Sequence, residues 1–454
     1  MLPEKFLKRM SILLGDEYPD FLAALGESCE RGFRLNKIKC EGEMPKGLLQ
    51  FAPEALSYVR GGYVCNADST GIGNTPEHHA GMIYVQDPGA MASAAVLDVK
   101  PDMWVADLCA APGGKSTQIA EALGEGGFIL SNEYVPKRAK ILVGNFERMG
   151  IRNGMVTSLD TAELAKMFAC VFDIVVADAP CSGEGMFRKD VPAAEEWSEE
   201  NVMLCRERQL TILDNASGMV KGGGVLLYST CTYSTEENEG VVAEFLNTHP
   251  DFRLIEAPKS IRDVTSDGIP YDGIGDVPIE MCRRFYPHVS RGEGQFIALM
   301  ERVGKTEPHF NYKDTAAKPS GEELRAVNDF FKNELSEIPK GRVAKYGNNL
   351  VLISHGCPLL PRGVFSAGVL IGELHGKVLV PSHQFFSAYG KLFKRQAHVD
   401  ADTARKYISG AEIPASFDGS GFCSVIYLGA PIGGGKASGG IIKNHYPKGL
   451  RKPL

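Results

Sequence analysis

Two cysteines occupy positions from which a thiol could do chemistry. Cys181 follows the apolar run 172–177 within the sequence Asp178-Ala-Pro-Cys. Cys231 follows the run 224–229 within the sequence Thr-Cys-Thr. If these runs are neighbouring parallel strands, their ends meet at one edge of a sheet, and Asp178, Cys181 and Cys231 should converge on one pocket. A single cysteine is more often buried and inert, but two just past adjacent strand ends indicate a reactive site.

The chemistry that a thiol in such a place could perform is covalent catalysis on a pyrimidine. Carbon 5 of cytosine is a poor nucleophile, so a thiolate that first adds at carbon 6 creates an enamine able to attack a methyl sulfonium. A base then removes the proton on carbon 5, and elimination releases the cysteine. Because a free thiol has a pKa of about 8.5, the site must favour the thiolate through positive charge or donors. Asp178 could hold the cytosine edge at N3 and N4, although spacing alone assigns none of these roles.

A loop of small residues follows the first strand of this region and precedes a helix. Small residues let a backbone approach a ligand closely at the carboxyl end of a strand. The glycine spacings of the P-loop and of the dinucleotide fingerprint are both absent. The alternative is a tight turn that binds nothing, and we expect a ligand instead. The loop residues are Cys109, Ala110, Ala111, Pro112, Gly113, Gly114 and Lys115.

Acidic residues at the next two strand ends indicate what that ligand contains. Glu133 ends the second strand, about 20 residues after the loop, where an acid can accept hydrogen bonds from both hydroxyls of a ribose. Asp160 would end the third strand, where a carboxylate could accept from an adenine amine. An ordinary helix N-cap is the alternative for Asp160. Together the loop and Glu133 predict a nucleoside-containing cofactor.

The elements that must position these residues form an α/β pattern. From about 80 to 305, short apolar runs alternate with helical segments, which is typical of a parallel sheet with both faces covered. The runs that we expect to be strands are 104–108, 128–130, 172–177 and 224–229.

The flanking regions differ from this core. Residues 1 to about 40 show apolar side chains at helical spacing, and we place an N-terminal extension over 1–80 before a core over 81–305. The polar segment 306–320 is a predicted linker. Beyond it, a helix near 322–333 and several β-like runs predict a separate α+β domain over 321–454.

Composition excludes several classes of protein. The 454 residues are too many for one ordinary core, and no apolar run reaches the length of a membrane helix. The start lacks the apolar core of a signal peptide, so we expect a cytoplasmic protein. The eleven cysteines are scattered, without a Cys-x-x-Cys pair, and predict reduced thiols and no metal site.

The net charge of −7 argues weakly against nucleic acid as a partner, but the charge is unevenly distributed. From residue 419 to the end there is no Asp or Glu, and the alternative to a binding surface there is a solvated tail. The basic residues of this segment are Lys436, Lys443, Lys448, Arg451 and Lys452.

At these motifs the chain strongly resembles the Nop/Sun group of RNA 5-methylcytosine methyltransferases, and within it the bacterial RsmF type. The most specific motifs are Cys-Ala-Ala-Pro-Gly-Gly-Lys at 109–115, Asp-Ala-Pro-Cys-Ser-Gly at 178–183 and Ser-Thr-Cys-Thr at 229–232. The segments 283–288 and 292–296 resemble the closing motif of the group, and 2–18 resembles its N-terminal RNA-binding extension. The segment 443–451 resembles the PUA-related RNA-binding end of the RsmF type.

The resemblance assigns roles that spacing leaves open. It implies a Rossmann-like class I core with a mostly parallel seven-stranded sheet and a PUA-like C-terminal domain. It implies that loop 109–115, with Glu133, Asp160 and Asp178, binds S-adenosylmethionine. The nucleophile of the group is the cysteine of the Thr-Cys motif, here Cys231, and Cys181 promotes product release. DNA cytosine methyltransferases instead attack with the cysteine of their Pro-Cys motif, so fold and chemistry alone would not decide.

The expected function is therefore methylation of carbon 5 of a cytosine in 16S ribosomal RNA. Transfer RNA is the nearest rival substrate. A rival from another class is a noncatalytic ribosome-assembly protein that binds RNA, but such a protein would need neither Cys181 nor Cys231. We expect RNA or the small ribosomal subunit as partner, no DNA or membrane partner, and a monomer.

Overall fold

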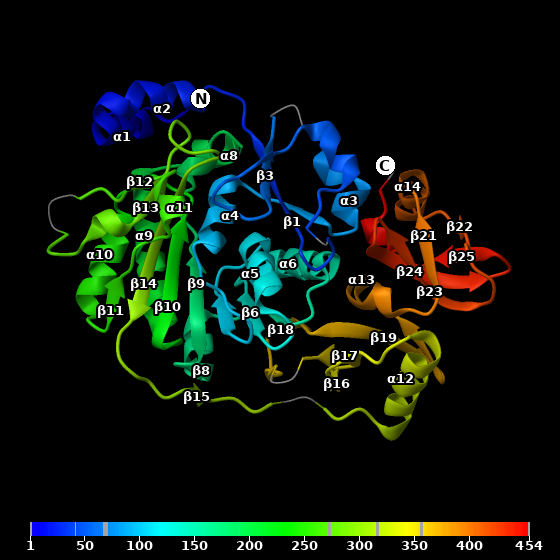
Figure 1. Cartoon of the computed structure of the whole chain (residues 1–454). Coiled ribbons are helices and arrows are strands. Elements are labelled where there is room, and N and C mark those ends of the chain that lie inside the picture. The colour runs from blue at the N-terminus through cyan, green and yellow to red at the C-terminus, as the bar shows by residue number, and fades with distance from the viewer. Residues whose placement is uncertain are drawn as a thin grey trace.

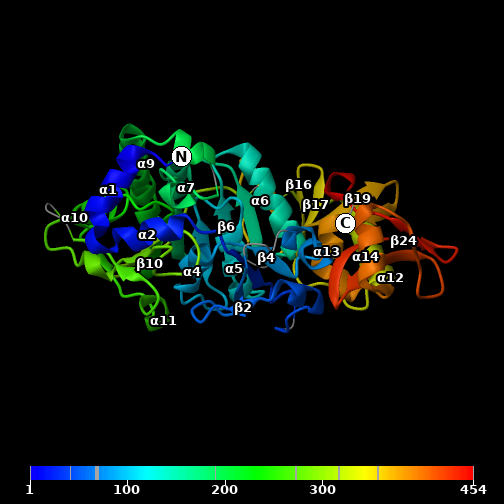
Figure 2. The same ribbon diagram turned by 90° about the horizontal axis from the view of Figure 1, so that it is seen from above.

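The computed structural model describes residues 2–40, 42–66, 71–189, 191–270, 274–314, 317–354 and 357–452. Figure 1 shows a large central sheet with α1 (Glu4–Leu14) and α2 (Tyr18–Leu25) above one end. The C-terminal elements lie at the other end, as the view from above in Figure 2 also shows. Across the described ranges, no helix combines the length and apolar character that a membrane span requires.

The central sheet has ten strands within the described residues, in the order β12-β13-β14-β10-β9-β5-β6-β7-β18, with β11 also paired to β14. Strands β7, β6, β5, β9 and β10 are parallel, whereas β14 is antiparallel to β10. These five, with β14 and β11, form the seven-stranded class I arrangement, and the other three extend it. The bounds are β5 Trp104–Asp107, β6 Phe128–Asn132, β7 Gly154–Thr157, β9 Phe172–Asp178, β10 Val220–Thr230, β11 Phe252–Leu254, β12 Ser266–Asp267, β13 Arg283–Phe285, β14 Gln295–Arg302 and β18 Val364–Ala367.

Helices cover both faces of this sheet, as the runs of buried residues predict. Neighbouring strand residues point to opposite faces, so Val105 belongs to one apolar cluster and Ala106 to the other. The cluster around Val105 includes residues of α4 (Pro88–Ala95), α5 (Gly114–Leu123) and α6 (Pro136–Met149). The cluster around Ala106 includes residues of α7 (Thr161–Met167), α9 (Glu199–Ser217) and α10 (Glu239–Thr248). The expected Rossmann-like core is confirmed.

The N-terminal region is helical only at its start. Helices α1 and α2 pack on aromatic side chains of the core, including Trp197 and Tyr233. The expectation of helix up to about residue 40 is wrong from residue 31, where Arg31–Leu35 forms strand β1. Phe33 and Leu35 alternate into a small apolar cluster, and a Cβ on Gly32 would lie 2.3 Å from the Gln86 carbonyl oxygen. Pairing with a neighbouring strand, which the sequence did not reveal, overrides the helical pattern.

Strand β1 belongs to an antiparallel sheet with the order β2-β3-β1-β4. The other helices and strands between the N-terminus and the end of the core are β2 Glu54–Ala55, β3 Gly62–Cys65, β4 Ile83–Val85, α3 Pro76–His79, α8 Val191–Glu195 and α11 Lys259–Arg262.

The C-terminal region begins with the expected helix, α12 (Gly321–Glu334), whose capping box joins Ser320 and Glu323. It is not wholly separate from the core, because β18 pairs with β7 at the sheet edge. In the predicted linker, of which residues 315 and 316 lie outside the described ranges, β15 (His309–Phe310) pairs with β8 (Phe168–Ala169). The division at 305 and 321 stays a prediction.

Two further sheets complete this region, with the orders β16-β17-β19-β20 and β21-β23-β24-β25-β22. Their bounds, with those of the helices between them, are β16 Arg342–Tyr346, β17 Asn349–Ile353, β19 Val369–His375, β20 Val378–Pro381, α13 His383–Tyr389, β21 Gln396–Val399, α14 Ala401–Ser409, β22 Ile413–Pro414, β23 Gly421–Tyr427, β24 Ala430–Ser438 and β25 Ile441–Asn444.

Candidate active site

A cavity of about 420 Å³ lies where the parallel strands of the core end. It contains both the loop after β5 and the residues after β9 and β10, as expected for ligand sites of open α/β sheets. Cys231 and Asp178 therefore face the same space as the predicted cofactor loop. Of the residues predicted for the site, those that line the cavity are Cys109, Ala110, Ala111, Pro112, Gly114, Lys115, Asp178 and Cys231.

The two candidate cysteines are in contact. The parallel pairing of β9 with β10 places Asp178 opposite Ser229, and the Sγ atoms of Cys181 and Cys231 lie 3.3 Å apart. The hydrogen bond with Cys231, together with burial, raises the pKa of the Cys181 thiol well above its usual value. Cys231 is among the described residues that line the cavity, whereas Cys181 is not. A ligand in the cavity can therefore contact the Cys231 thiol more directly than the Cys181 thiol.

An ion pair joins the cofactor loop to the strand that carries the first cysteine. The ammonium of Lys115, whose side chain is 9% exposed, lies 2.7 Å from Asp178 Oδ2. Asp178 Oδ1 accepts a hydrogen bond from the Ser229 hydroxyl at 2.6 Å. Because both carboxylate oxygens have partners on different segments, Asp178 fixes the loop, β9 and β10 relative to one another.

A buried polar network holds the segment that carries Cys231. The Glu184 carboxylate accepts hydrogen bonds from the Thr232 hydroxyl and the Tyr233 amide at 2.9 and 3.0 Å. Burial raises the pKa of Glu184. On the other side, Glu237 accepts from the Ser182 amide at 3.0 Å, and burial raises the pKa of its carboxyl to about 7. Sequence reasoning missed both acids, although Glu184 stands only three residues after Cys181.

Two buried carboxylates at strand ends retain free acceptor atoms. Asp107 Oδ2 accepts from the Ser116 hydroxyl at 2.6 Å, but Oδ1 has no hydrogen-bond partner. Burial raises the pKa of Asp107 to about 7. Glu133 is 3% exposed, and its Oε2 also lacks a hydrogen bond, although the Arg138 guanidinium lies 3.3 Å away. Since buried polar atoms normally have partners, these atoms fit the amine and hydroxyl donors of a nucleoside cofactor. Asp107 was not among the predicted residues.

Three predicted cofactor residues do not line the cavity. Gly113 is the N-cap of α5 with a φ of 114°, a value that favours glycine. Glu133 directly follows β6 and is buried. Asp160 is exposed and caps α7, where its side chain accepts from the Ala162 amide at 2.8 Å. Asp160 therefore serves as a helix N-cap, and a contact between Asp160 and the cofactor stays a prediction.

Residues far away in the sequence complete the cavity. Tyr84, Gln86 and Asp87 come from the segment that includes β4, and Glu293 and Gln295 come from the start of β14. The segment 292–296 was noted for its resemblance to a closing motif, but no pattern placed it or residues 84–87 at this site, because only packing of the N-terminal region and β14 against the loop brings them there.

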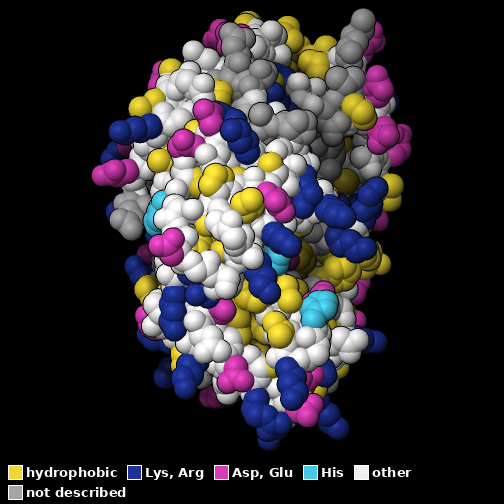
Figure 3. Space-filling view, turned by 90° about the vertical axis from the view of Figure 1, so that its right-hand side faces the viewer, with side chains coloured by type: hydrophobic (Ala, Val, Ile, Leu, Met, Phe, Trp, Pro, Cys, Tyr) yellow, Lys and Arg dark blue, Asp and Glu magenta, His cyan; other side chains and the backbone are white. Residues whose placement is uncertain are grey.

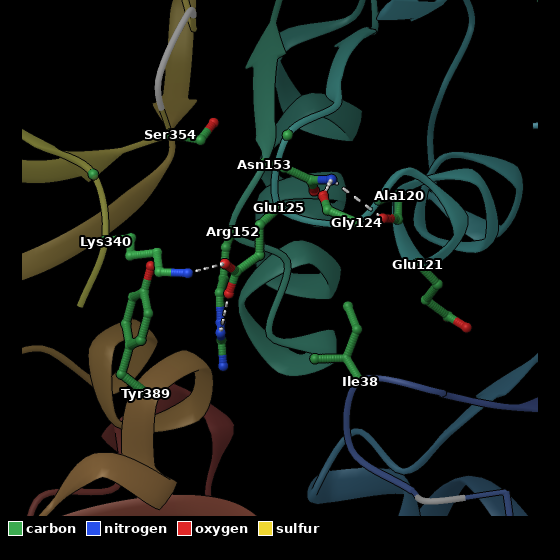
Figure 4. A pocket seen from close by; sticks show the side chains of 12 residues that line it. Ile38, Ala120, Glu121, Gly124, Glu125, Arg152, Asn153, Lys340, Ser354 and Tyr389 are labelled. Atoms are coloured by element: carbon green, nitrogen blue, oxygen red, sulfur yellow. Dashed lines mark hydrogen bonds and ion pairs between the residues drawn. The ribbon is translucent and has the colours of Figure 1, made fainter. Parts of the chain in front are cut away.

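A second cavity, of about 500 Å³, lies at the opposite edge of the sheet and contains none of the predicted site residues. Figure 4 shows Glu125 of the core between Arg152 and Lys340. Their charged atoms lie 3.6 and 4.0 Å from the Glu125 carboxylate. This cavity lies between the core and the C-terminal region, and neither candidate cysteine is among its described lining residues.

The strand order, the loop after β5 and the carboxylates at the ends of β5 and β6 define a class I methyltransferase. A sequence model described as 16S rRNA methyltransferase RsmB/F matches residues 94–301. A model of the N-terminal domain of 16S rRNA methyltransferase RsmF matches residues 2–88, and a model of the RsmF PUA domain matches residues 394–452. The core of this chain thus matches the model of the RsmB/F methyltransferases, and its terminal regions match the models of the terminal domains of the RsmF type.

Individual proteins agree with this assignment. The ribosomal RNA small subunit methyltransferase F of Vibrio vulnificus is 29% identical over 99% of this chain and 97% of its own length. The enzyme of the same name from a Shewanella species is 28% identical over 95% of this chain and 93% of its own. A crystal structure of a methyltransferase homologue from Pyrococcus horikoshii is 26% identical, with a TM-score of 0.56, and covers 66% of this chain and 95% of that chain. The resemblance seen in the motifs is confirmed.

Proposed function

We propose that this protein transfers a methyl group from S-adenosylmethionine to carbon 5 of a cytosine in 16S ribosomal RNA. One observation carries the proposal: Cys231 lines the same cavity as loop 109–115 and Asp178. A thiol that faces the cofactor cavity is what covalent activation of a pyrimidine requires. The names of the relatives, which describe small-subunit ribosomal RNA enzymes, support this choice of substrate.

The loop, Asp107 Oδ1 and the Glu133 carboxylate would hold the cofactor, which would supply an electrophilic methyl group. Asp160 is an additional candidate at the end of β7. A Cys231 thiolate adds to carbon 6 of the cytosine, which must leave its stack to enter the cavity. We expect Asp178, whose carboxylate contacts Lys115 and Ser229, to orient the cytosine edge.

Release of the product requires cleavage of the bond between Cys231 and carbon 6. The raised pKa of Cys181 keeps that thiol protonated at neutral pH, since a thiol whose pKa is raised loses its proton only at higher pH. Its Sγ lies 3.3 Å from Cys231 Sγ. Cys181 can therefore donate a hydrogen bond to the departing sulfur, after a base has removed the proton on carbon 5.

The C-terminal sheet offers a place for RNA phosphates. Lys436 and Lys443 are directly opposite each other on β24 and β25, and both are exposed. Like charges directly opposite each other on a sheet repel, and an anion between them would remove that cost. Figure 3 shows Lys and Arg side chains scattered over this end of the molecule, with Asp and Glu side chains among them. We propose that this end and the N-terminal region both bind RNA.

The function is tested by mapping 5-methylcytosine. In a strain that lacks this protein, bisulfite sequencing should show one or more cytosines of 16S ribosomal RNA that lose their methyl group, and the gene should restore it. Loss confined to transfer RNA would establish the rival substrate. An unchanged pattern in both RNAs would favour a noncatalytic binding protein.

Removal of the two facing lysines should weaken RNA binding. Each phosphate contact contributes roughly 0.7–0.9 to the slope of log affinity against log salt, so Lys436→Ala with Lys443→Ala should reduce that slope by roughly 1.5. Filter binding of 16S ribosomal RNA at several salt concentrations measures it. Deletion from residue 436 onward is unsuitable, because it removes β25 and the buried side chains of Ile442 and Tyr446.

The matched control removes two lysines of the core, Lys100 and Lys259, each paired with a neighbouring acid. It loses the same number of positive charges, but away from the proposed RNA-binding surface, so it should keep the wild-type slope. Equal slopes for all three proteins would contradict the docking role of the β24–β25 lysines.

A further inference from the structure

We propose that Arg34 is a positioning residue of the cofactor site, through which the N-terminal region holds the loop that binds S-adenosylmethionine. The resemblance gave this region a role in binding RNA only. The inference rests on the proposed function, because it requires that loop 109–115 binds the cofactor.

Arg34 connects β1 to the start of α5, the helix that follows the loop. Its side chain is buried, and Nη2 donates to the Gly114 carbonyl at 3.2 Å and to the Thr117 hydroxyl at 2.5 Å. The Thr117 hydroxyl in turn donates to the Gly113 carbonyl at 2.6 Å. The guanidinium thus reaches both glycines of the loop, one directly and one through Thr117.

Charge holds the guanidinium in this place. Nη1 forms an ion pair with Glu121, one turn further along α5, and both side chains are at most 5% exposed. The guanidinium also lies over the Tyr84 ring, 5.2 Å from its centroid. A planar fork with several donors can serve the helix start and Glu121 together, whereas a single ammonium cannot.

The same arginine fixes a lining residue of the cavity. Arg34 Nε donates to Gln86 Oε1 at 3.3 Å. The Gln86 amide packs so closely on the loop that a Cβ on Gly114 would lie 2.9 Å from it. Gln86 and Tyr84 line the cavity with Gly114. Loss of Arg34 therefore releases the loop and the adjacent N-terminal segment at once.

A purely structural ion pair is the alternative, and two substitutions separate it from a positioning role. Arg34→Met removes every contact. Arg34→Lys keeps a positive charge for Glu121 but loses the additional donors to Gly114, Thr117 and Gln86. A structural ion pair predicts that lysine restores the wild-type properties, and a positioning role predicts that it does not.

The control is Arg302→Met. Arg302 also combines an ion pair, with Asp251 at 2.9 Å, and a hydrogen bond to a backbone carbonyl, that of Val220 at 2.8 Å. Arg302 is the last residue of β14, beside the start of β10, and it does not line the cavity. This variant loses a comparable set of contacts without touching the loop.

The experiment measures binding of S-adenosylhomocysteine by calorimetry, below the unfolding temperature of every variant. We expect the dissociation constant to rise at least tenfold for Arg34→Met and severalfold for Arg34→Lys, and to stay within twofold of wild type for Arg302→Met. Affinity for 16S ribosomal RNA should be unchanged in all three. If Arg34→Met does not fold, Arg34→Lys alone decides.

Wild-type affinity in the Arg34 variants, or an equal loss in Arg302→Met, would overturn the inference. A wild-type protein that bound no S-adenosylhomocysteine would overturn the proposed function itself, together with the inference that rests on it.

Discussion

Replacement of Cys231 by alanine is expected to abolish RNA methylation and to leave cofactor binding nearly unchanged. The side chain is the only thiol of the predicted pair that lines the cavity in the described structure. Without it, carbon 5 of the cytosine is not activated, and loss of a covalent nucleophile lowers the rate by roughly a thousandfold or more. Incorporation of labelled methyl groups into 16S ribosomal RNA measures the first effect, and calorimetry with S-adenosylhomocysteine measures the second.

Cys423→Ala provides the control, since Cys423 is a buried free cysteine of the C-terminal sheet. It should methylate RNA at the wild-type rate. Methylation that survived Cys231→Ala would refute the assigned nucleophile. If activity were lost only in Cys181→Ala, without an adduct, Cys181 would be the nucleophile, as the Pro-Cys cysteine is in the DNA cytosine methyltransferases.

Replacement of Cys181 by alanine is expected to trap the protein on its RNA. The Cys181 thiol lies 3.3 Å from the sulfur that must leave carbon 6, and its raised pKa makes it a hydrogen-bond donor at neutral pH. Without that donor, elimination slows and the covalent adduct accumulates. Denaturing gels should show a slowly migrating protein–RNA species, and multiple turnover should fall to about one methyl group per protein.

The double variant with both cysteines replaced by alanine is the matched control. It has no nucleophile, so it should give no such species. An adduct in the double variant would show that RNA is attached to a residue other than Cys231. A Cys181→Ala variant that turns over normally without an adduct would refute the role of Cys181 in product release.

Most of the parallel core could be predicted from the sequence. The apolar runs at 104–108, 128–130, 172–177 and 224–229 are strands β5, β6, β9 and β10, because a strand buried on both faces must be apolar along its length. Strand β1 could not be predicted in this way. Its pattern of Phe33 and Leu35 is short, and its partners β3 and β4 lie far along the chain.

The order of residues along the chain is enough to predict which of them follow the parallel strands, and therefore that Asp178, Cys181, Cys231 and the loop after β5 share one edge. Local order suffices for this, since a parallel sheet aligns all its carboxyl ends. The folded chain was needed to see that Cys231 lines the cavity, that Glu184 and Glu237 hold its segment, and that Arg34 reaches Gly114. Those contacts join residues from 48 to 80 positions apart, and no local periodicity encodes a contact that only packing of separate elements creates.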